Sequence, residues 1–363
     1  MEIKKVLTKP ENLKELFKDA SQLDFGKNFT DHMFSMEYLP GKEWTNAEIK
    51  PYQPLVLDPA TMVLHYSQAV FEGQKAYLSP EGEILLFRPD ENAKRINRSL
   101  VRMGMPTIPE DIYLQAECEL LKIEKRWIPK QRGTSLYIRP VVLATEVLLG
   151  AVRPSDRYLF YIILSPVGFF YKEGFNPVKL IAEEKYTRAA SGGTGEAKTG
   201  GNYAGTIVAC HKASQKGYSQ VLWLDAKEHR YVEEVGANNI FFAIDGKLVT
   251  PPLHGTILPG VTRQSVIELA EDLDIVVEER LISIDEIVAG IESGKLTEAF
   301  GSGTAAAISP VGTICYKDKD YVINNNETGA WTQKIYDILI GMQYGELEDK
   351  YGWIYKVEKI VGN

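Results

Sequence analysis

A chain of 363 residues is longer than a single hydrophobic core usually serves, and this length constrains the fold most. Two domains are therefore expected. The stretch at 167–178, VGFFYKEGFNPV, is rich in aromatic residues, glycine and proline, which is typical of a connection between domains. We place a small N-terminal α+β domain at 1–170, a connector at 171–181 and a large C-terminal domain at 182–363.

The composition excludes several classes of protein. Apolar residues make up 44% of the chain and charged residues 25%, as in ordinary soluble globular proteins, and the net charge of −8 provides no basic field for nucleic acid or anionic lipid. The apolar windows are too short to cross a bilayer. Cys118, Cys210 and Cys315 are scattered and odd in number, which favours a reducing compartment over disulfides or a zinc cluster. We therefore expect a cytoplasmic protein without a metal site.

Hydrophobic periodicity predicts an α+β organisation. In the first half it predicts short strands at 62–66, 75–78 and 84–88, a helix from Pro89, a helix at 109–126, and strands at 135–145 and 157–165. In the second half it predicts strands at 178–182, 221–225, 239–244 and 247–250, and helices at 203–215, after Gly260 and at 331–343. Asp245-Gly246 between two of these strands is a strong hairpin signal.

The segment SGGTGEAKTGGNYAG surrounds one lysine, Lys198, with glycines that allow close backbone approach to a ligand. The flanking glycines are Gly192, Gly193, Gly195, Gly200 and Gly201. A lysine in this setting can be a phosphate clamp, a Schiff-base nucleophile or an ordinary surface charge in a flexible loop.

The phosphate clamp is the weakest of the three interpretations. GGTGEAKT resembles a nucleotide-binding P-loop, but Ala197 stands where that loop requires the glycine before its lysine. A long helix should also follow directly, and Gly200-Gly201-Asn202 discourages one.

The Schiff-base interpretation requires partners for a pyridoxal-phosphate (PLP) cofactor: a phosphate site and a carboxylate for the ring nitrogen. In LPGVTRQS, the amides of Val261 and Thr262 would face an anion at a helix N-terminus. Arg95 can add positive charge, and Glu234 can pair with the ring nitrogen. Each also has an ordinary interpretation, as a solvated helix face, an edge-strand charge or a plain turn. Periodicity alone does not assemble them into one site.

Seven motifs connect these candidates along the chain. They are LHYSQAVFEGQKAY (64–77), FRPDENAKRINRS (87–99), SLYIRP (135–140), AKTGGNY (197–203), EEVGANNIFF (233–242), LPGVTRQS (258–265) and FGSGTAA (300–306). Through these motifs, nearly the whole chain resembles the branched-chain-amino-acid aminotransferases of the fold-type-IV PLP family. The resemblance implies two domains with mixed, largely antiparallel sheets and flanking helices, as in D-amino-acid aminotransferases.

The resemblance implies a role for each candidate cofactor residue. Lys198 matches the Schiff-base lysine and general base, Tyr203 the tyrosine that hydrogen-bonds the phenolic oxygen of PLP, and Glu234 the carboxylate at the pyridine nitrogen. Further positions near the cofactor are the phosphate ligands Arg95, Val261 and Thr262, the hydroxyl partners Ser302 and Thr304, and Arg188, whose role is left open.

Substrate positions also carry over from the family. An aromatic pocket for an aliphatic side chain is implied at Phe29, Tyr66, Phe71, Tyr137 and Phe170. Polar groups for the substrate carboxylate are implied at Tyr137 and Arg139, together with the amides of Ala305 and Ala306. By themselves, these aromatic residues would be interpreted as core packing.

The implied reaction is the transfer of the amino group of leucine, isoleucine or valine to 2-oxoglutarate, giving glutamate. This is the last step of branched-chain amino acid synthesis or the first of their breakdown. A homodimer is implied as well. Within the fold type, a D-amino-acid aminotransferase or an aminodeoxychorismate lyase is the alternative, against which YIRP and the aromatic positions argue. A threonine found after EVG in the vertebrate branch is Ala237 here, and Ala306-Ala307-Ile308-Ser309 replaces that branch's redox C-x-x-C motif.

Overall fold

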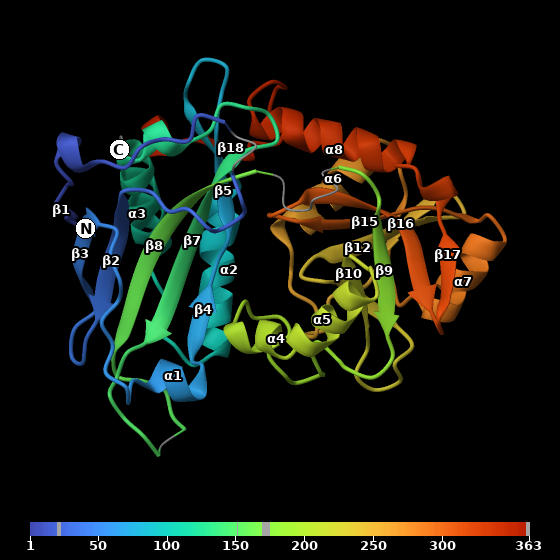
Figure 1. The fold of residues 1–363 in the computed structure, drawn as a ribbon, viewed down its shortest axis with the longest axis horizontal. Coiled ribbons are helices and arrows are strands. Elements are labelled where there is room, and N and C mark those ends of the chain that lie inside the picture. Colours follow the sequence, from blue (N-terminus) through green and yellow to red (C-terminus); the bar gives the residue numbers. More distant parts are fainter. Residues whose placement is uncertain (20–22, 151, 169–174, 361–363) are drawn as a thin grey trace. The chain divides into compact units, whose positions relative to one another are not determined.

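The computed structural model describes residues 1–19, 23–150, 152–168 and 175–360. The chain forms two compact units, and in the described part of the chain each is built on a nine-stranded sheet (Figure 1). The expected mixed, largely antiparallel sheets with flanking helices are confirmed. The first unit comprises Met1–Phe170, Ala197–Gly200 and Gly341–Asn363, and the second Tyr171–Glu196 and Gly201–Ile340.

This grouping differs from the expected division at two places. Ala197–Gly200, which contains Lys198, clusters with the first unit because Thr199 forms a β-bridge with Val70 there. Gly341–Asn363 also clusters with the first unit. Of the expected connector at 171–181, residues 171–174 lie outside the described residues, and from Val178 the chain is already a sheet strand.

The sheet of the first unit has the strand order β1-β3-β2-β8-β7-β5-β6-β18, with β4 paired to β7. All neighbours are antiparallel except β1 and β3. The strands are β1 Lys4–Lys5, β2 His32–Tyr38, β3 Trp44–Pro51, β4 Ala69–Phe71, β5 Gln74–Leu78, β6 Ile84–Phe87, β7 Ser135–Ala144, β8 Tyr158–Val167 and β18 Ile354–Lys356.

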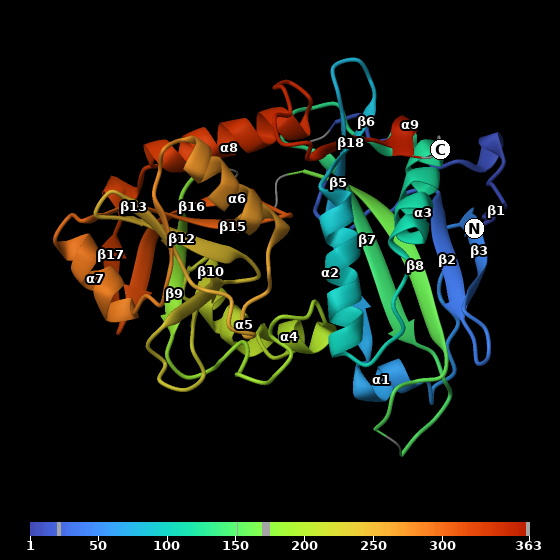
Figure 2. The same ribbon diagram turned by 180° about the vertical axis from the view of Figure 1, so that it is seen from behind.

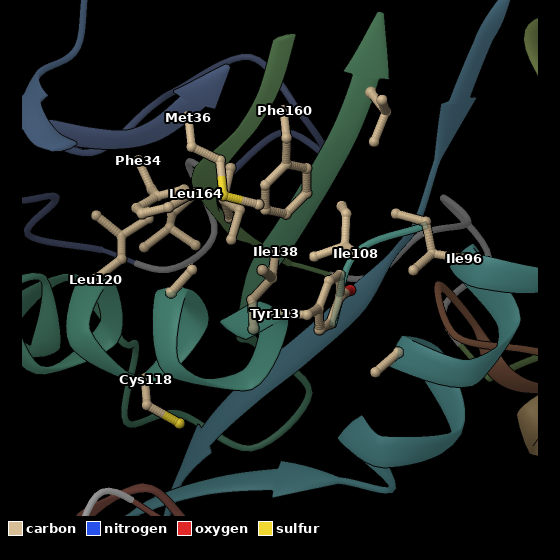
Figure 3. Packing of buried hydrophobic residues seen from close by; sticks show 14 of the residues in the cluster. Phe34, Met36, Ile96, Ile108, Tyr113, Cys118, Leu120, Ile138, Phe160 and Leu164 are labelled. Atoms are coloured by element: carbon tan, nitrogen blue, oxygen red, sulfur yellow. The ribbon is translucent and has the colours of Figure 1, made fainter. Parts of the chain in front are cut away.

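Two helices, α2 (Pro89–Arg102) and α3 (Glu110–Ile123), cover one face of this sheet (Figure 2). Pro89 at the first helical position and acidic residues in the first turn favour the start of α2. The main core lies between these helices and the sheet, where the rings of Tyr113 and Phe160 have centroids 6.0 Å apart and Ile96 belongs to the same cluster (Figure 3). The remaining helices of this unit are α1 Met62–Tyr66, α9 Val357–Ile360 and the short 3₁₀ turns Pro10–Asn12 and Lys125–Trp127.

The strand predicted at 62–66 is wrong, because this segment is the helix α1. A five-residue apolar run does not distinguish a strand from a helical turn by periodicity. Tertiary contacts determine the helical form here. The amide of Met62 donates to the carbonyl of Glu146, and Ser67 ends the turn in the left-handed region with φ of 53°.

The sheet of the second unit has the order β11-β10-β9-β16-β15-β12-β13-β14, with β17 paired to β16. Its buried cluster is rich in branched aliphatic residues from both the strands and the helix α7 (Ile284–Glu292). The strands are β9 Val178–Glu183, β10 Gln220–Leu224, β11 Val232–Val235, β12 Asn239–Ile244, β13 Lys247–Thr250, β14 Val277–Glu279, β15 Leu296–Gly303, β16 Ala307–Tyr316 and β17 Lys319–Val322.

The helices predicted in the second half are present, although the one expected at 203–215 is divided in two. The helical segments are α4 Gly200–Ala204, α5 Ile207–Gln215, α6 Val261–Asp272, α7 Ile284–Glu292, α8 Ala330–Gln343 and the 3₁₀ turn Asn324–Asn326. Among the helices of the described ranges, none is long and apolar enough to cross a membrane.

Candidate active site

The residues expected at the site fall into two groups, one in each unit. The first unit holds Phe29, Tyr66, Phe71, Arg95, Tyr137, Arg139 and Lys198. The second holds Arg188, Tyr203, Glu234, Val261, Thr262, Ser302, Thr304, Ala305 and Ala306. Phe170 lies outside the described residues.

Main-chain contacts fix Lys198 beside strand β4 of the first unit. Its amide donates to Ser99 Oγ at 2.9 Å, and its carbonyl accepts from the amide of Phe71 at 3.0 Å. The next residue, Thr199, donates from Oγ1 to the carbonyl of Ala69 at 2.7 Å. The backbone on either side of the lysine is thus attached to a strand and a helix, so that only its side chain has freedom to move.

Two cations share the ring of Phe71. Lys198 Nζ lies 5.0 Å from the ring centroid, and the guanidinium carbon of Arg139 lies 4.8 Å from it, both within the range of cation–π attraction. Tyr137 is two residues from Arg139 on β7 and therefore shares its face of the sheet. Its hydroxyl accepts from Arg139 at 3.2 Å. An amine, a guanidinium, a phenol and an aromatic surface therefore lie close together in the first unit.

Gly73 provides the space for this group. A Cβ atom at position 73 would collide with the hydroxyl of Tyr137, so only glycine fits there without a shift. Sequence reasoning missed this glycine, although it lies in the motif LHYSQAVFEGQKAY.

The two other aromatic residues expected in the pocket make different contacts. The ring of Phe29 stacks on Tyr52 with centroids 5.1 Å apart. The hydroxyl of Tyr66 accepts from the amide of Gly150 at 2.8 Å. These contacts attach Phe29 to the β3 end and Tyr66 to the loop after β7, so their place in a substrate pocket stays a prediction.

Arg95, expected to bind phosphate, forms a buried ion pair with Glu72. Its Nε and one terminal nitrogen donate to the two carboxylate oxygens at 2.7 and 2.8 Å, with Glu72 0% exposed and Arg95 4% exposed. Burial by itself would raise the pKa of Glu72, but the charges of Arg95 and Lys198 outweigh it, so the pKa lies below its ordinary value. Glu72 is therefore a carboxylate. Sequence reasoning missed it because a single glutamate between Phe71 and Gly73 carries no periodic signal.

In the second unit, Glu234 on β11 is buried and held by two donors. Its Oε1 accepts from Arg188 at 3.1 Å and from the amide of Leu258 at 2.8 Å. Arg188 also donates to the carbonyls of Gly195, at 3.3 Å, and Thr256. The sequence left the role of Arg188 open. In the structure Arg188 pairs with the Glu234 carboxylate and connects it to the loops that contain Gly195 and Thr256.

Leu258, whose amide binds Glu234, lies three residues before Val261, the first residue of α6, so the N-terminus of α6 is close to Glu234. Gly260 is the N-cap and provides no side-chain acceptor for the first amides, among them those of Val261 and Thr262. The side chain of Asn239 donates to the carbonyl of Leu258 at 3.0 Å, and Asn239 pairs with Ser302 of β15. Amides at a helix start beside a hydroxyl are suited to a phosphate group.

Two buried polar atoms test whether these residues fit PLP. Within the described residues, Ser302 Oγ and Arg188 Nε have no hydrogen-bond partner. Buried polar groups are nearly always paired, so each requires an additional partner. A phosphate oxygen can accept from the Ser302 hydroxyl, and Arg188 has a further donor for an acceptor atom beside Glu234, so the donor set fits the cofactor.

The remaining expected residues of this unit lie in two segments. Thr304, Ala305 and Ala306 form the half-buried turn between β15 and β16. Tyr203 is the fourth residue of α4. No group of acidic, histidine or cysteine residues able to hold a metal ion occurs among the residues searched, which are those described.

The comparisons with known proteins agree on the family. The model of amino-transferase class IV matches residues 69–314, which is more than half of the chain. Branched-chain-amino-acid aminotransferase 2 of Bacillus subtilis is 52% identical over 339 residues, covering 93% of each chain. The branched-chain amino acid aminotransferase structure from Escherichia coli has a TM-score of 0.73 at 28% identity, covering 91% of this chain and 99% of that one.

A second solved structure is the PLP form of the branched-chain amino acid aminotransferase from Thermobaculum terrenum. It has a TM-score of 0.73 at 25% identity and covers 90% of this chain and 98% of that one. The resemblance found in the seven motifs is thereby confirmed. The chain belongs to the class IV aminotransferases.

Proposed function

We propose that this protein is a PLP-dependent branched-chain-amino-acid aminotransferase. It transfers the amino group of L-leucine, L-isoleucine or L-valine to 2-oxoglutarate and produces the branched 2-oxo acid and L-glutamate. Lys198 carries the cofactor. Both half-reactions use the same site alternately, so the kinetics are ping-pong.

The observation that carries this proposal is the shared ring of Phe71. It places the Lys198 amine and the Arg139 guanidinium, 5.0 and 4.8 Å from one centroid, on a single apolar surface. A branched amino acid needs these three things from an enzyme: a base for its Cα proton, a cation for its carboxylate and an apolar wall for its side chain.

When bound, PLP supplies an electron sink for the charge that develops as Cα loses its proton. Lys198 is the base that takes this proton at Nζ. Glu234 would pair with the ring nitrogen and favour its protonated form, and Arg188 keeps the Glu234 carboxylate in place. Tyr203 donates to the phenolic oxygen.

The phosphate group of the cofactor has its own set of ligands in this proposal. The amides of Val261 and Thr262 at the start of α6 donate to it, as do the hydroxyls of Ser302 and Thr304. Arg95 adds positive charge. The unpartnered Ser302 hydroxyl among the described residues supports this assignment.

Arg139 and Tyr137 bind the substrate carboxylate, with the amides of Ala305 and Ala306 as additional donors. The aromatic side chains then form the wall for the aliphatic part. Each methylene buried there contributes about 0.8 kcal/mol, and a charged side chain would lose its hydration without gaining a partner. This wall favours leucine, isoleucine and valine over polar amino acids. Its members in the described residues are Phe29, Tyr66, Phe71 and Tyr137.

The test of the function compares the two enantiomers of leucine. Purified protein with PLP and 2-oxoglutarate is expected to form L-glutamate from L-leucine and none above background from D-leucine. Glutamate is measured by coupled dehydrogenase absorbance. L-Alanine and L-aspartate serve as controls for the aliphatic wall. Faster turnover of D-leucine than of L-leucine would contradict the proposal.

We also propose a homodimer, supported by exposed apolar residues on α1, on the segment before it and on the loop after β7. Val147 pairs with Thr61 there, which brings the loop after β7 onto the segment before α1. Large apolar patches of this kind mark association sites. The exposed members are Val56 at 97%, Val152 at 93%, Leu64 at 57%, Val147 at 56% and Leu149 at 56%.

Leu149→Lys should weaken self-association roughly 10-fold or more, because the interface would then bury a lysine charge that has lost its hydration and gained no partner. Val101→Lys is the matched control, since Val101 is 67% exposed on α2 and outside this surface. Sedimentation velocity over a dilution series measures both. Equal dissociation constants for Leu149→Lys and wild type would show that the dimer uses another face.

A cytoplasmic location is proposed too, because all three cysteines are free thiols.

A further inference from the structure

Glu72 has no role in the reaction described above, yet it is one of the most completely paired carboxylates in the first unit. Besides Arg95, its Oε2 accepts from Asn92 at 2.9 Å and from the amide of Gly73 at 3.0 Å. Its own amide donates to the carbonyl of Pro140 at 2.9 Å. Four hydrogen bonds to this fully buried carboxylate, two from Arg95 and one each from Asn92 and Gly73, define one orientation for it.

The same carboxylate lies beside the attachment of Lys198. The amide of Phe71, the residue before Glu72, donates to the carbonyl of Lys198. Ser99, which accepts from the amide of Lys198, is one helical turn after Arg95 on α2. The backbone of Lys198 is therefore held by α2, which carries the guanidinium partner of Glu72, and by the last residue of β4, which directly precedes Glu72.

Building on the proposed function, we infer that Glu72 is a positioning residue of the aminotransferase reaction. Its carboxylate holds the Arg95 guanidinium in the orientation needed for the cofactor phosphate. Its negative charge also stabilises the ammonium form that Lys198 adopts when it takes the substrate proton. Glu72 touches neither substrate nor cofactor and acts through these two residues.

The charge of Glu72 is opposite to that of a protonated Lys198. Arg139 shares the Phe71 ring with Lys198, and Arg95 pairs with Glu72, so Glu72 is a carboxylate among cationic side chains. The attraction between Lys198 and Glu72 is mutual, since the lysine contributes to the lowered pKa of Glu72. Neutralising position 72 therefore removes a charge that favours the ammonium form of Lys198.

A second buried carboxyl group, Glu117, provides a matched control. Its Oε1 accepts from Gln74 at 2.6 Å, and the same Gln74 nitrogen donates to Tyr113 at 2.8 Å. Burial raises the pKa of Glu117 well above its ordinary value, and the charge of Glu72 adds to the increase. Glu117 is thus a neutral acid and Glu72 an anion, although both are 0% exposed.

Glutamine has the shape of a neutral glutamic acid. Glu117→Gln therefore leaves the charge at position 117 unchanged, whereas Glu72→Gln removes the negative charge at position 72. Glu117→Gln should leave PLP affinity and turnover within about twofold of wild type. Its stability at neutral pH should equal or exceed that of wild type: native Glu117 keeps a proton that the unfolded chain releases above the ordinary pKa, which costs stability as the pH rises.

Glu72→Gln should weaken PLP binding to the apoprotein about 10- to 100-fold, by analogy with the loss in affinity when a residue that orients a metal ligand is replaced. It should lower kcat for L-leucine more than it raises KM. The pH midpoint of the bound cofactor's absorbance change should fall by about one unit or more, because a charge that favours the protonated form is gone. The purely structural role of a buried ion pair would not move that midpoint.

Glu72→Asp keeps the charge and shortens the side chain, so it should keep the wild-type midpoint while binding PLP more weakly. It replaces Glu72→Gln if that variant does not fold. Wild-type PLP affinity and midpoint in Glu72→Gln, or wild-type PLP affinity in Glu72→Asp, would overturn the inference. Failure of the wild type to transaminate L-leucine would instead contradict the proposed function, and PLP titrations would still measure the effect of Glu72 on binding.

Discussion

Lys198→Ala is expected to abolish transamination of L-leucine, with a loss in kcat of at least about 10⁴-fold. Proton transfer by a positioned base alone contributes roughly 10²- to 10⁴-fold, and Lys198 has the covalent role as well. Its Nζ lies over the Phe71 ring, and its backbone is already anchored by Ser99. Removing the side chain therefore deletes the reactive amine without removing those anchors.

The measurement combines initial rates of glutamate formation with the visible absorbance of the PLP-treated protein. The variant should lack the absorbance of lysine-bound PLP and should unfold in urea within about 1 kcal/mol of wild type. Lys4→Ala is the control, because the side chain of Lys4 is 73% exposed and forms a surface ion pair with Glu48. Turnover above about a hundredth of the wild-type rate in Lys198→Ala would remove the lysine from the mechanism.

Glu234→Gln should lower kcat by roughly 10²- to 10³-fold, the scale for losing one preorganised electrostatic partner in a dry site. The amide oxygen of glutamine can still accept from Leu258 and Arg188, so the local fold is preserved. What disappears is the negative charge that keeps the pyridine nitrogen protonated. The affinity for PLP should fall only modestly, since the phosphate ligands are elsewhere.

Single-turnover absorbance with L-leucine separates these two effects from product release. Glu292→Gln is the matched control, because Glu292 is 55% exposed and pairs with Lys319 at the surface of the same unit. A Glu234→Gln rate within threefold of wild type would refute the proposed contact with the ring nitrogen.

The parts of the fold that could be predicted are those with long periodic patterns or strong end signals. The helix from Pro89 occurs as α2, because Pro89 starts it and Ala93, Ile96 and Leu100 give it one buried stripe. The β12–β13 hairpin occurs as expected, with Asp245 at φ of 49° and Gly246 at 74° in the turn. The segment 62–66 carries neither kind of signal, and tertiary hydrogen bonds made it a helix.

The clustering of Lys198 with the first unit was not accessible from the sequence. It depends on the bridge between Thr199 and Val70, residues far apart in the chain that neither composition nor spacing connects. Glu72 was missed for the same reason. Its importance comes from Arg95 and Asn92, which lie on a helix separated from it by two strands. Motifs identified single residues of the candidate site, whereas their charge partners emerged only with the tertiary structure.

The central claim, that Lys198 carries the cofactor, can be tested without any variant. Wild-type protein is incubated with PLP, treated with sodium borohydride to make the lysine–cofactor bond permanent, digested and analysed by peptide mass spectrometry. We predict one stoichiometric modification on the peptide containing Lys198, and its loss when excess L-leucine is added before the borohydride. A stoichiometric modification on another lysine, with the Lys198 peptide unmodified, would contradict the claim.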